Sequence, residues 1–192
     1  MIVEGLYFRL FYYCQIFKGL VIAMSQCCNP GQITENVPVR YQQRICPNDS
    51  TKGKPVELVT LKSLLIGAAL EKLDPQSTYT FCPSSNCSVV YFSNTGQTFT
   101  TVDLKVPVFQ KDFNEQVPAC YCFDWSRQRI REEIEQTGTS SAVASITAHI
   151  KAKRCGCEVN NPKGVCCLAN VRETVHQIQQ SLSSSSSGTS AA

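Results

Sequence analysis

The chain has 192 residues, enough for one domain of ordinary size or two small ones. Hydrophobic residues account for 43% and charged residues for 17%, which excludes a chain that is disordered as a whole. The formal net charge is +3 and Lys and Arg form no long block, so nucleic acid and anionic membranes are poor candidates for the main partner.

Residues 1–23 are apolar and aromatic but are interrupted by Glu4, Arg9 and Lys18. Their uncharged runs are too short to span a bilayer, and they lack the basic start of a secretory signal peptide. Polar, Cys-containing sequence begins directly after Met24. We therefore predict that residues 1–23 are a non-native extension of a protein that starts at Met24, the alternative being an amphipathic helix lying on a membrane. Without a signal peptide, the predicted location is cytoplasmic and no membrane partner is expected.

Residues 24–45 show no usable periodicity and are predicted to be an extended arm. Residues 46–117 are predicted to form a β-rich subdomain, because short runs of β-branched and aromatic residues alternate with turn residues. The expected strands are 56–61, 79–81, 88–92 and 97–102. Residues 61–73 are expected to form either a short helix or a loop over the core.

Residues 118–180 are predicted to be a helical subdomain. Ser126 is a suitable N-cap for a helix through Gln136, with Gly138 as its stop. Two further helices are expected, over 140–153 and from about residue 166 onward. Residues 181–192 are Ser-rich and are predicted to be a disordered tail. The expected fold class is therefore α+β, with a small β-rich half followed by a helical half.

Cysteine is the unusual feature of the composition, with 12 residues, whereas the two histidines, His149 and His176, are expected to face solvent rather than bind metal. Such a cysteine content arises from a disulfide framework in a secreted protein or from thiolate metal sites in a reducing compartment. Four short-range pairs rarely form disulfides within the pair, but readily place two sulfurs on one metal. These pairs are Cys27–Cys28, Cys120-x-Cys122, Cys155-x-Cys157 and Cys166–Cys167. The spacing therefore favours metal binding.

Cys120 and Cys122 stand just before the first predicted helix, whose N-terminal N–H groups and dipole favour thiolate. Four thiolates hold either a [2Fe–2S] cluster or a tetrahedral zinc ion. On spacing alone, the remaining two ligands would come from Cys155, Cys157, Cys166 and Cys167.

A second candidate set lies in the predicted β-rich half. Cys46 and Asp49 are separated by two residues and Cys82 and Cys87 by four, spacings that occur in structural zinc sites. A carboxylate is an acceptable zinc ligand, although thiolate is commoner. Cys27 and Cys28 are the alternatives to Asp49.

Five segments of the chain resemble the CopZ-type proteins, whose N-terminal module carries one zinc ion and one [2Fe–2S] cluster. They are CP at 46–47, TLKSLL at 60–65, TFCPSSNCSVVYF at 80–92, VPACYCF at 117–123 and CEVNNPKGVCC at 157–167. The helical half also resembles the bacterioferritin-associated ferredoxin family, in which a C-x-C pair is followed at a distance by further cysteines; here 34 residues separate Cys122 from Cys157.

The resemblance implies roles for individual residues. The [2Fe–2S] ligands would be Cys120, Cys122, Cys157 and Cys167, with Cys166 as the alternative to Cys167 and Cys155 as the alternative to Cys157. The zinc ligands would be Cys46, Cys82 and Cys87, with Asp49 where relatives often have a second cysteine. The copper-binding domain of the family carries an M-x-C-x-x-C motif, but this sequence contains no C-x-x-C.

These features predict a metal-binding protein rather than an enzyme, without catalytic residues. The expected function is one-electron transfer or an accessory role in copper or iron homeostasis, with a redox or metal-transfer protein as partner. Two alternatives remain: a structural interaction module with zinc in both sites, and a metal-free thiol–disulfide oxidoreductase that uses the closely spaced cysteines.

Overall fold

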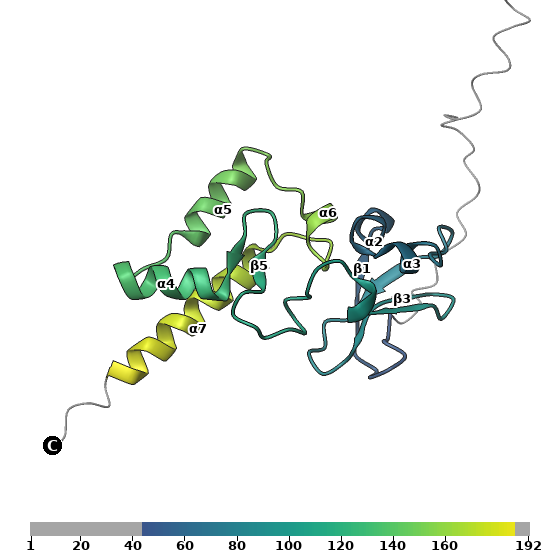
Figure 1. Cartoon of the computed structure of the whole chain (residues 1–192), viewed down its shortest axis with the longest axis horizontal. Coiled ribbons are helices and arrows are strands. Elements are labelled where there is room, and N and C mark those ends of the chain that lie inside the picture. Colours follow the sequence, from purple (N-terminus) through teal and green to yellow (C-terminus); the bar gives the residue numbers. More distant parts are fainter. Residues whose placement is uncertain (1–43, 187–192) are drawn as a thin grey trace, which may run out of the picture. The chain divides into compact units, whose positions relative to one another are not determined.

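A computed structural model describes residues 44–186, which belong to one compact unit and contain both sheet and helices (Figure 1). The α+β class predicted from the sequence is confirmed. The predicted extension 1–23, most of the predicted arm 24–45, including Cys27 and Cys28, and residues 187–192 lie outside the described residues. Within the described part, no helix is long and apolar enough to cross a membrane.

A four-stranded antiparallel sheet forms the first half. Its strands lie side by side in chain order, and each pairs with the next. They are β1 (Lys54–Val56), β2 (Tyr79–Phe81), β3 (Val89–Ser93) and β4 (Thr98–Thr100). Two short helices, α2 (Leu58–Leu64) and α3 (Gly67–Leu70), connect β1 to β2, and the 3₁₀ turn η1 (Thr101–Asp103) follows β4. The core of this half contains Leu61, Leu65, Phe81 and Tyr91, all fully buried.

The predicted strand over 56–61 is wrong, because only its first residue, Val56, belongs to a strand. Glu57 is the N-cap of α2, and the chain is helical from Leu58. Leu58, Leu61 and Leu65 recur at helical spacing and pack into the core, so tertiary burial of this face outweighs the β propensity of the neighbouring valines.

The second half begins with a two-stranded hairpin that the sequence analysis did not predict, β5 (Pro118–Cys120) and β6 (Trp125–Ser126). Helices follow: α4 (Arg127–Thr137), α5 (Ala142–Lys151), the single-turn α6 (Cys157–Asn160) and α7 (Leu168–Ser186). The predicted signals that bound α4 are confirmed, since the Ser126 hydroxyl accepts a hydrogen bond from Arg129 N–H and Gly138 has a left-handed φ of 79°. Helix α7 continues through Ser186, so residues 181–186 are helical and not part of a disordered tail.

The two halves meet where α6 and the loop after it lie beside α2 (Figure 1). The Tyr91 hydroxyl donates to the Pro162 carbonyl at 2.7 Å, and both residues are fully buried. The Thr60 hydroxyl donates to the Glu158 carbonyl at 2.6 Å. Gly164 has a φ of 69° and closely approaches the β-rich half; a Cβ there would lie 2.8 Å from Cγ2 of Val56. The loop 157–164 is therefore held by side chains of the β-rich half.

We expect Tyr91→Phe to lower the free energy of unfolding by about 1–3 kcal/mol, because the buried Pro162 carbonyl loses its hydrogen-bond donor. Urea denaturation of the full chain, at matched metal content, measures this change. Thr137→Val is the control, since the Thr137 hydroxyl donates to the Glu133 carbonyl in an exposed setting and its removal should cost less than about 0.5 kcal/mol. Equal losses in the two variants would contradict a special role for the Tyr91 contact.

Candidate metal centres

The first cluster of metal-ligating side chains lies at one corner of the β-rich half. Cys46 precedes a tight turn in which Ser50 N–H donates to the Cys46 carbonyl and which carries Asp49. Cys82 directly follows β2 and Cys87 lies just before β3, so the loop between two paired strands brings both thiols to this turn. These are the four residues that the resemblance implied as zinc ligands.

The geometry of this cluster suits a single tetrahedral ion. One ligand atom from each of the four residues lies within 4.8 Å of all the others. Cys46 Sγ is 3.8 Å from Cys87 Sγ, and Cys82 Sγ is 3.9 Å from Asp49 Oδ1. A tetrahedral zinc ion with Zn–S bonds of about 2.3 Å places its sulfurs about 3.8 Å apart. The three cysteines are buried and Asp49 is exposed, so the donor set and the spacing fit zinc.

Neighbouring groups act on the ionisation of these ligands. Burial raises the pKa of Cys82 to about 12 and also raises the pKa of Cys46. Burial acts in the same direction on Cys87, but the Asn48 side-chain amide, 3.2 Å from its sulfur, and the Val89 N–H outweigh burial and lower the pKa of Cys87. Hydrogen bonds from Ser84 and Thr51 hold the pKa of the Asp49 carboxyl well below its usual range. Zinc must therefore displace protons from Cys46 and Cys82, which couples its binding to pH.

A second cluster, built from thiols alone, lies in the core of the helical half. Cys120 ends β5, Cys122 lies in the hairpin loop, Cys157 begins α6 and Cys167 directly precedes α7. Cys120, Cys157 and Cys167 are buried, whereas Cys122 is half-buried. Cys122 Sγ is 3.9 Å from Cys157 Sγ, and all four cysteines belong to the same hydrophobic core cluster. The fold therefore gathers the four cysteines named by the resemblance in one part of this core.

These thiols act on one another's ionisation. Hydrogen bonding from the Cys167 thiol lowers the pKa of Cys120 to about 7 and that of Cys157 to about 6. The same interaction raises the pKa of Cys167, and burial raises that of Cys122 to about 11. Four cysteines drawn from three chain segments match the number of donors that a [2Fe–2S] cluster or a tetrahedral zinc ion requires.

The structure also describes the two alternative cysteines. Cys166 is exposed while its neighbour Cys167 is buried against the other thiols. Cys155 is half-buried and its side chain is hydrogen-bonded to Cys157. Burial therefore favours Cys167 over Cys166, and Cys157 over Cys155, as the inner ligand of each pair.

Several residues that the sequence analysis did not single out support these clusters. The Lys111 ammonium donates to the carbonyls of Ser84 and Cys87, 2.7 and 2.9 Å away, and so anchors the loop that carries two of the zinc ligands. The amide of Asn160 lies 3.6 Å from Cys122 Sγ. No spacing rule marks these residues, because each acts through contacts with residues distant in sequence.

One expectation about histidine is wrong. His176 is exposed, as expected, but His149 is half-buried and stacks on Phe123 with ring centroids 4.0 Å apart. Its Nδ1 atom is buried and finds no hydrogen-bond partner within residues 44–186. Phe123, the residue after Cys122, covers the His149 ring. Helical periodicity could not reveal this contact, because the two residues lie far apart in the sequence.

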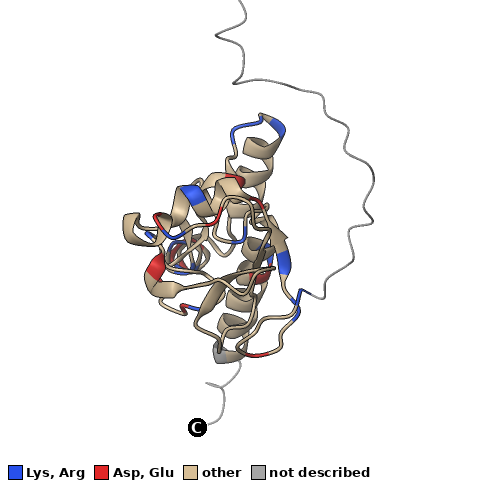
Figure 2. Ribbon diagram, turned by 90° about the vertical axis from the view of Figure 1, so that its right-hand side faces the viewer, with Lys and Arg blue, Asp and Glu red and all other residues tan. Residues whose placement is uncertain are grey.

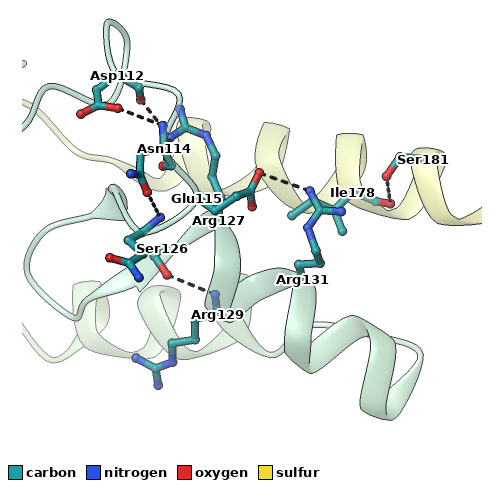
Figure 3. Close-up of polar contacts among 10 residues, drawn as sticks. Asp112, Asn114, Glu115, Ser126, Arg127, Arg129, Arg131, Ile178 and Ser181 are labelled. Carbon is teal, nitrogen blue, oxygen red and sulfur yellow. Dashed lines mark hydrogen bonds and ion pairs between the residues drawn. The ribbon is translucent and has the colours of Figure 1, made fainter.

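Arginines at the start of α4 fix the hairpin against the preceding segment (Figure 3). The Arg127 guanidinium donates to the carbonyls of Phe109, Asp112 and Asn114 and lies 3.9 Å from the Phe109 ring centroid. Arg131 forms an ion pair with Glu115 at 3.4 Å. These contacts hold the hairpin that carries Cys120 and Cys122 in place.

Comparison with known proteins agrees with this geometry. Residues 43–105 match the CopZ family described as a zinc binding domain. Over 122 residues, the chain is 34% identical to the copper chaperone CopZ of Archaeoglobus fulgidus. This region covers 64% of the chain and 57% of that protein, so the chain spans little more than half of its relative's length. The X-ray structure of the N-terminal domain of A. fulgidus CopZ is also similar, with a TM-score of 0.58 and 30% identity over 67% of this chain and 95% of that domain.

The chain therefore contains a zinc-binding domain of the CopZ type. More particularly, it is homologous to the N-terminal domain of the copper chaperone CopZ of A. fulgidus.

We expect Asp49→Asn to weaken zinc binding at least about tenfold. Residues that only hydrogen-bond to a metal ligand already contribute at least about tenfold to metal affinity, and Asp49 lies close enough to be a ligand itself. Asp49→Cys should bind zinc at least as tightly as the wild type, since it supplies the commoner thiolate donor. Competition with a chromogenic zinc chelator measures both effects. Glu71→Gln, an exposed change on α3's C-cap, is the control. Wild-type affinity in Asp49→Asn would remove Asp49 from the ligand set and favour Cys27 or Cys28.

Proposed function

We propose that this chain is a non-enzymatic protein of metal homeostasis that binds one zinc ion and one [2Fe–2S] cluster and transfers single electrons. The carrying observation is that Cys120, Cys122, Cys157 and Cys167 come together in the core of the helical half, with the sulfurs of Cys122 and Cys157 3.9 Å apart. Three of them are buried, and all four are free thiols rather than disulfides. Cys46, Asp49, Cys82 and Cys87 hold the zinc ion in this proposal.

A bound [2Fe–2S] cluster supplies a one-electron couple, in which two ferric ions become one ferric and one ferrous ion on reduction. The four thiolates hold it inside the helical half, and burial of three of them limits solvent access. The positive end of the 19-residue helix α7 lies directly after Cys167 and favours negative charge there. The zinc ion has a structural role, since it closes a corner in which three of five buried core residues are cysteines.

The link to copper rests on the relatives. The A. fulgidus protein is named a copper chaperone, and delivery of a metal ion or an electron requires a protein partner. This sequence contains no C-x-x-C, so copper transfer through that motif is not part of the proposal. The charges fit a protein partner better than nucleic acid, because Lys and Arg are interspersed with Asp and Glu in the view of Figure 2.

Metal analysis of the full chain, purified without oxygen, tests the proposal. We expect about two iron, two acid-labile sulfide and one zinc per chain, with visible thiolate-to-iron absorption that dithionite bleaches. Zinc in both sites without iron, even after reconstitution with iron and sulfide, would establish the structural zinc module instead. Free, alkylatable thiols with no metal bound would establish the thiol–disulfide oxidoreductase.

Single substitutions should separate the ligands from their neighbours. We expect Cys120→Ala and Cys157→Ala to lose the visible absorption and the iron, because each removes one of four thiolates, while zinc content stays at the wild-type value. Cys166→Ala is the matched control and should retain both metals, since this thiol is exposed. Loss of iron in Cys166→Ala with retention in Cys167→Ala would reverse the ligand assignment of the adjacent pair.

A further inference from the structure

We propose that Asn160 is a positioning residue that raises the reduction potential of the cluster through a hydrogen bond from its side-chain amide to the sulfur of Cys122. This inference rests on the proposed function, since it requires a redox-active cluster at the four cysteines. It assigns to Asn160 a role in tuning the centre rather than in binding it.

Cys122 is the candidate ligand that lies within reach of a side-chain amide. It is half-buried, whereas the other three candidate ligands are buried, so its sulfur lies at the solvent side of the thiol cluster. Asn160 Nδ2 lies 3.6 Å from this sulfur, within hydrogen-bond distance for a sulfur acceptor. The Gly156 backbone N–H is a second donor to the same sulfur. Both donors flank Cys157, whose own sulfur is 3.9 Å from that of Cys122.

The single turn of α6 places Asn160 for this contact. The helix runs from Cys157 to Asn160, so a ligand and a donor stand three residues apart, on the same side of one helical turn. Gly156 leaves space for the amide, because a Cβ at this position would lie 3.2 Å from Asn160 Nδ2 and 3.4 Å from Val159 Cγ2. Gly156 therefore has two roles. Its backbone N–H donates to the Cys122 sulfur, and its lack of a side chain leaves space for the Asn160 amide.

The neighbouring asparagine shows what a purely structural role looks like here. Asn161 is 1% exposed, its amide donates to the Val165 carbonyl at 2.6 Å, and its Oδ1 accepts from Lys163 N–H. These bonds build the loop that leads to Cys167. Asn160 is exposed, and the contact that its side chain makes is with Cys122. Hydrogen bonds within the loop therefore explain why position 161 is an asparagine, whereas the contact with the Cys122 sulfur explains the asparagine at position 160.

The zinc centre uses the same device. Asn48 Nδ2 lies 3.2 Å from Cys87 Sγ, so each centre has one asparagine amide directed at one cysteine sulfur. An N–H dipole stabilises a sulfur more as negative charge on it increases, and reduction adds one negative charge to an iron–sulfur cluster. Zinc has no redox chemistry, so the amide of Asn48 affects only ligand ionisation and affinity. Asn48 thus provides a matched control.

Spectroelectrochemical titration of the anaerobic full chain, with dithionite as reductant and visible absorption as readout, tests the inference. We expect the midpoint potential to fall in Asn160→Ala and to fall further in Asn160→Asp, which keeps the shape but replaces the donor with a carboxylate. Asn160→Gln should recover part of the difference, and Asn48→Ala should leave the potential at the wild-type value. Gly156→Ala should lower the potential by displacing the amide, but should add little in an Asn160→Ala background.

Two results would overturn the inference, and they are distinguishable. A wild-type chain that binds no iron overturns the inference together with the proposed function. Iron-loaded Asn160→Ala and Asn160→Asp variants with the wild-type potential overturn the inference alone, and leave the cluster in place.

Discussion

The fold depends on the buried contact between the β-rich half and the loop that begins with Cys157. The hydroxyls of Thr60 and Tyr91 belong to α2 and β3, yet they saturate carbonyls of Glu158 and Pro162 in the helical half. A single turn of helix followed by an irregular loop has too few internal hydrogen bonds to hold its own shape. The loop that begins with Cys157 is therefore held by residues about 70 to 100 positions earlier in the chain, which ties the position of one cysteine of the thiol cluster to the β-rich half.

Cysteine has two roles in this molecule, as ligand and as core residue. Cys120, Cys157 and Cys167 pack with Ile130, Ile146 and Val171 in the helical core, and Cys46, Cys82 and Cys87 pack with Val89 and Phe92 at the zinc corner. A thiol is a small apolar group when protonated and a strong ligand when ionised. In the proposed function, metal bound at these thiols replaces weak thiol contacts with coordinate bonds, which would couple metal content to the stability of each half.

The sequence predicted well what depends on local pattern. The cap at Ser126 and the stop at Gly138 are local, and the structure has both as expected. The first turn of α2 was predicted as a strand, because burial of Leu61 and Leu65 decides its conformation, and that burial is a property of the sheet beneath them. The choice within Cys166–Cys167 could not be made from spacing, since adjacent residues differ only in which one the fold turns inward. Spacing also could not single out Asn160, because its partner, Cys122, lies 38 residues away in the sequence.

The segment between the two halves is attached at both ends. The Lys111 ammonium donates to the carbonyls of Ser84 and Cys87 in the loop between β2 and β3. The Arg127 guanidinium donates to the carbonyls of Phe109, Asp112 and Asn114. This connection is therefore fixed by hydrogen bonds on both sides. An inserted residue within 109–114 would disturb the contacts that lead to both cysteine clusters. The halves are therefore poor candidates for separate use as interchangeable modules, although each has its own core.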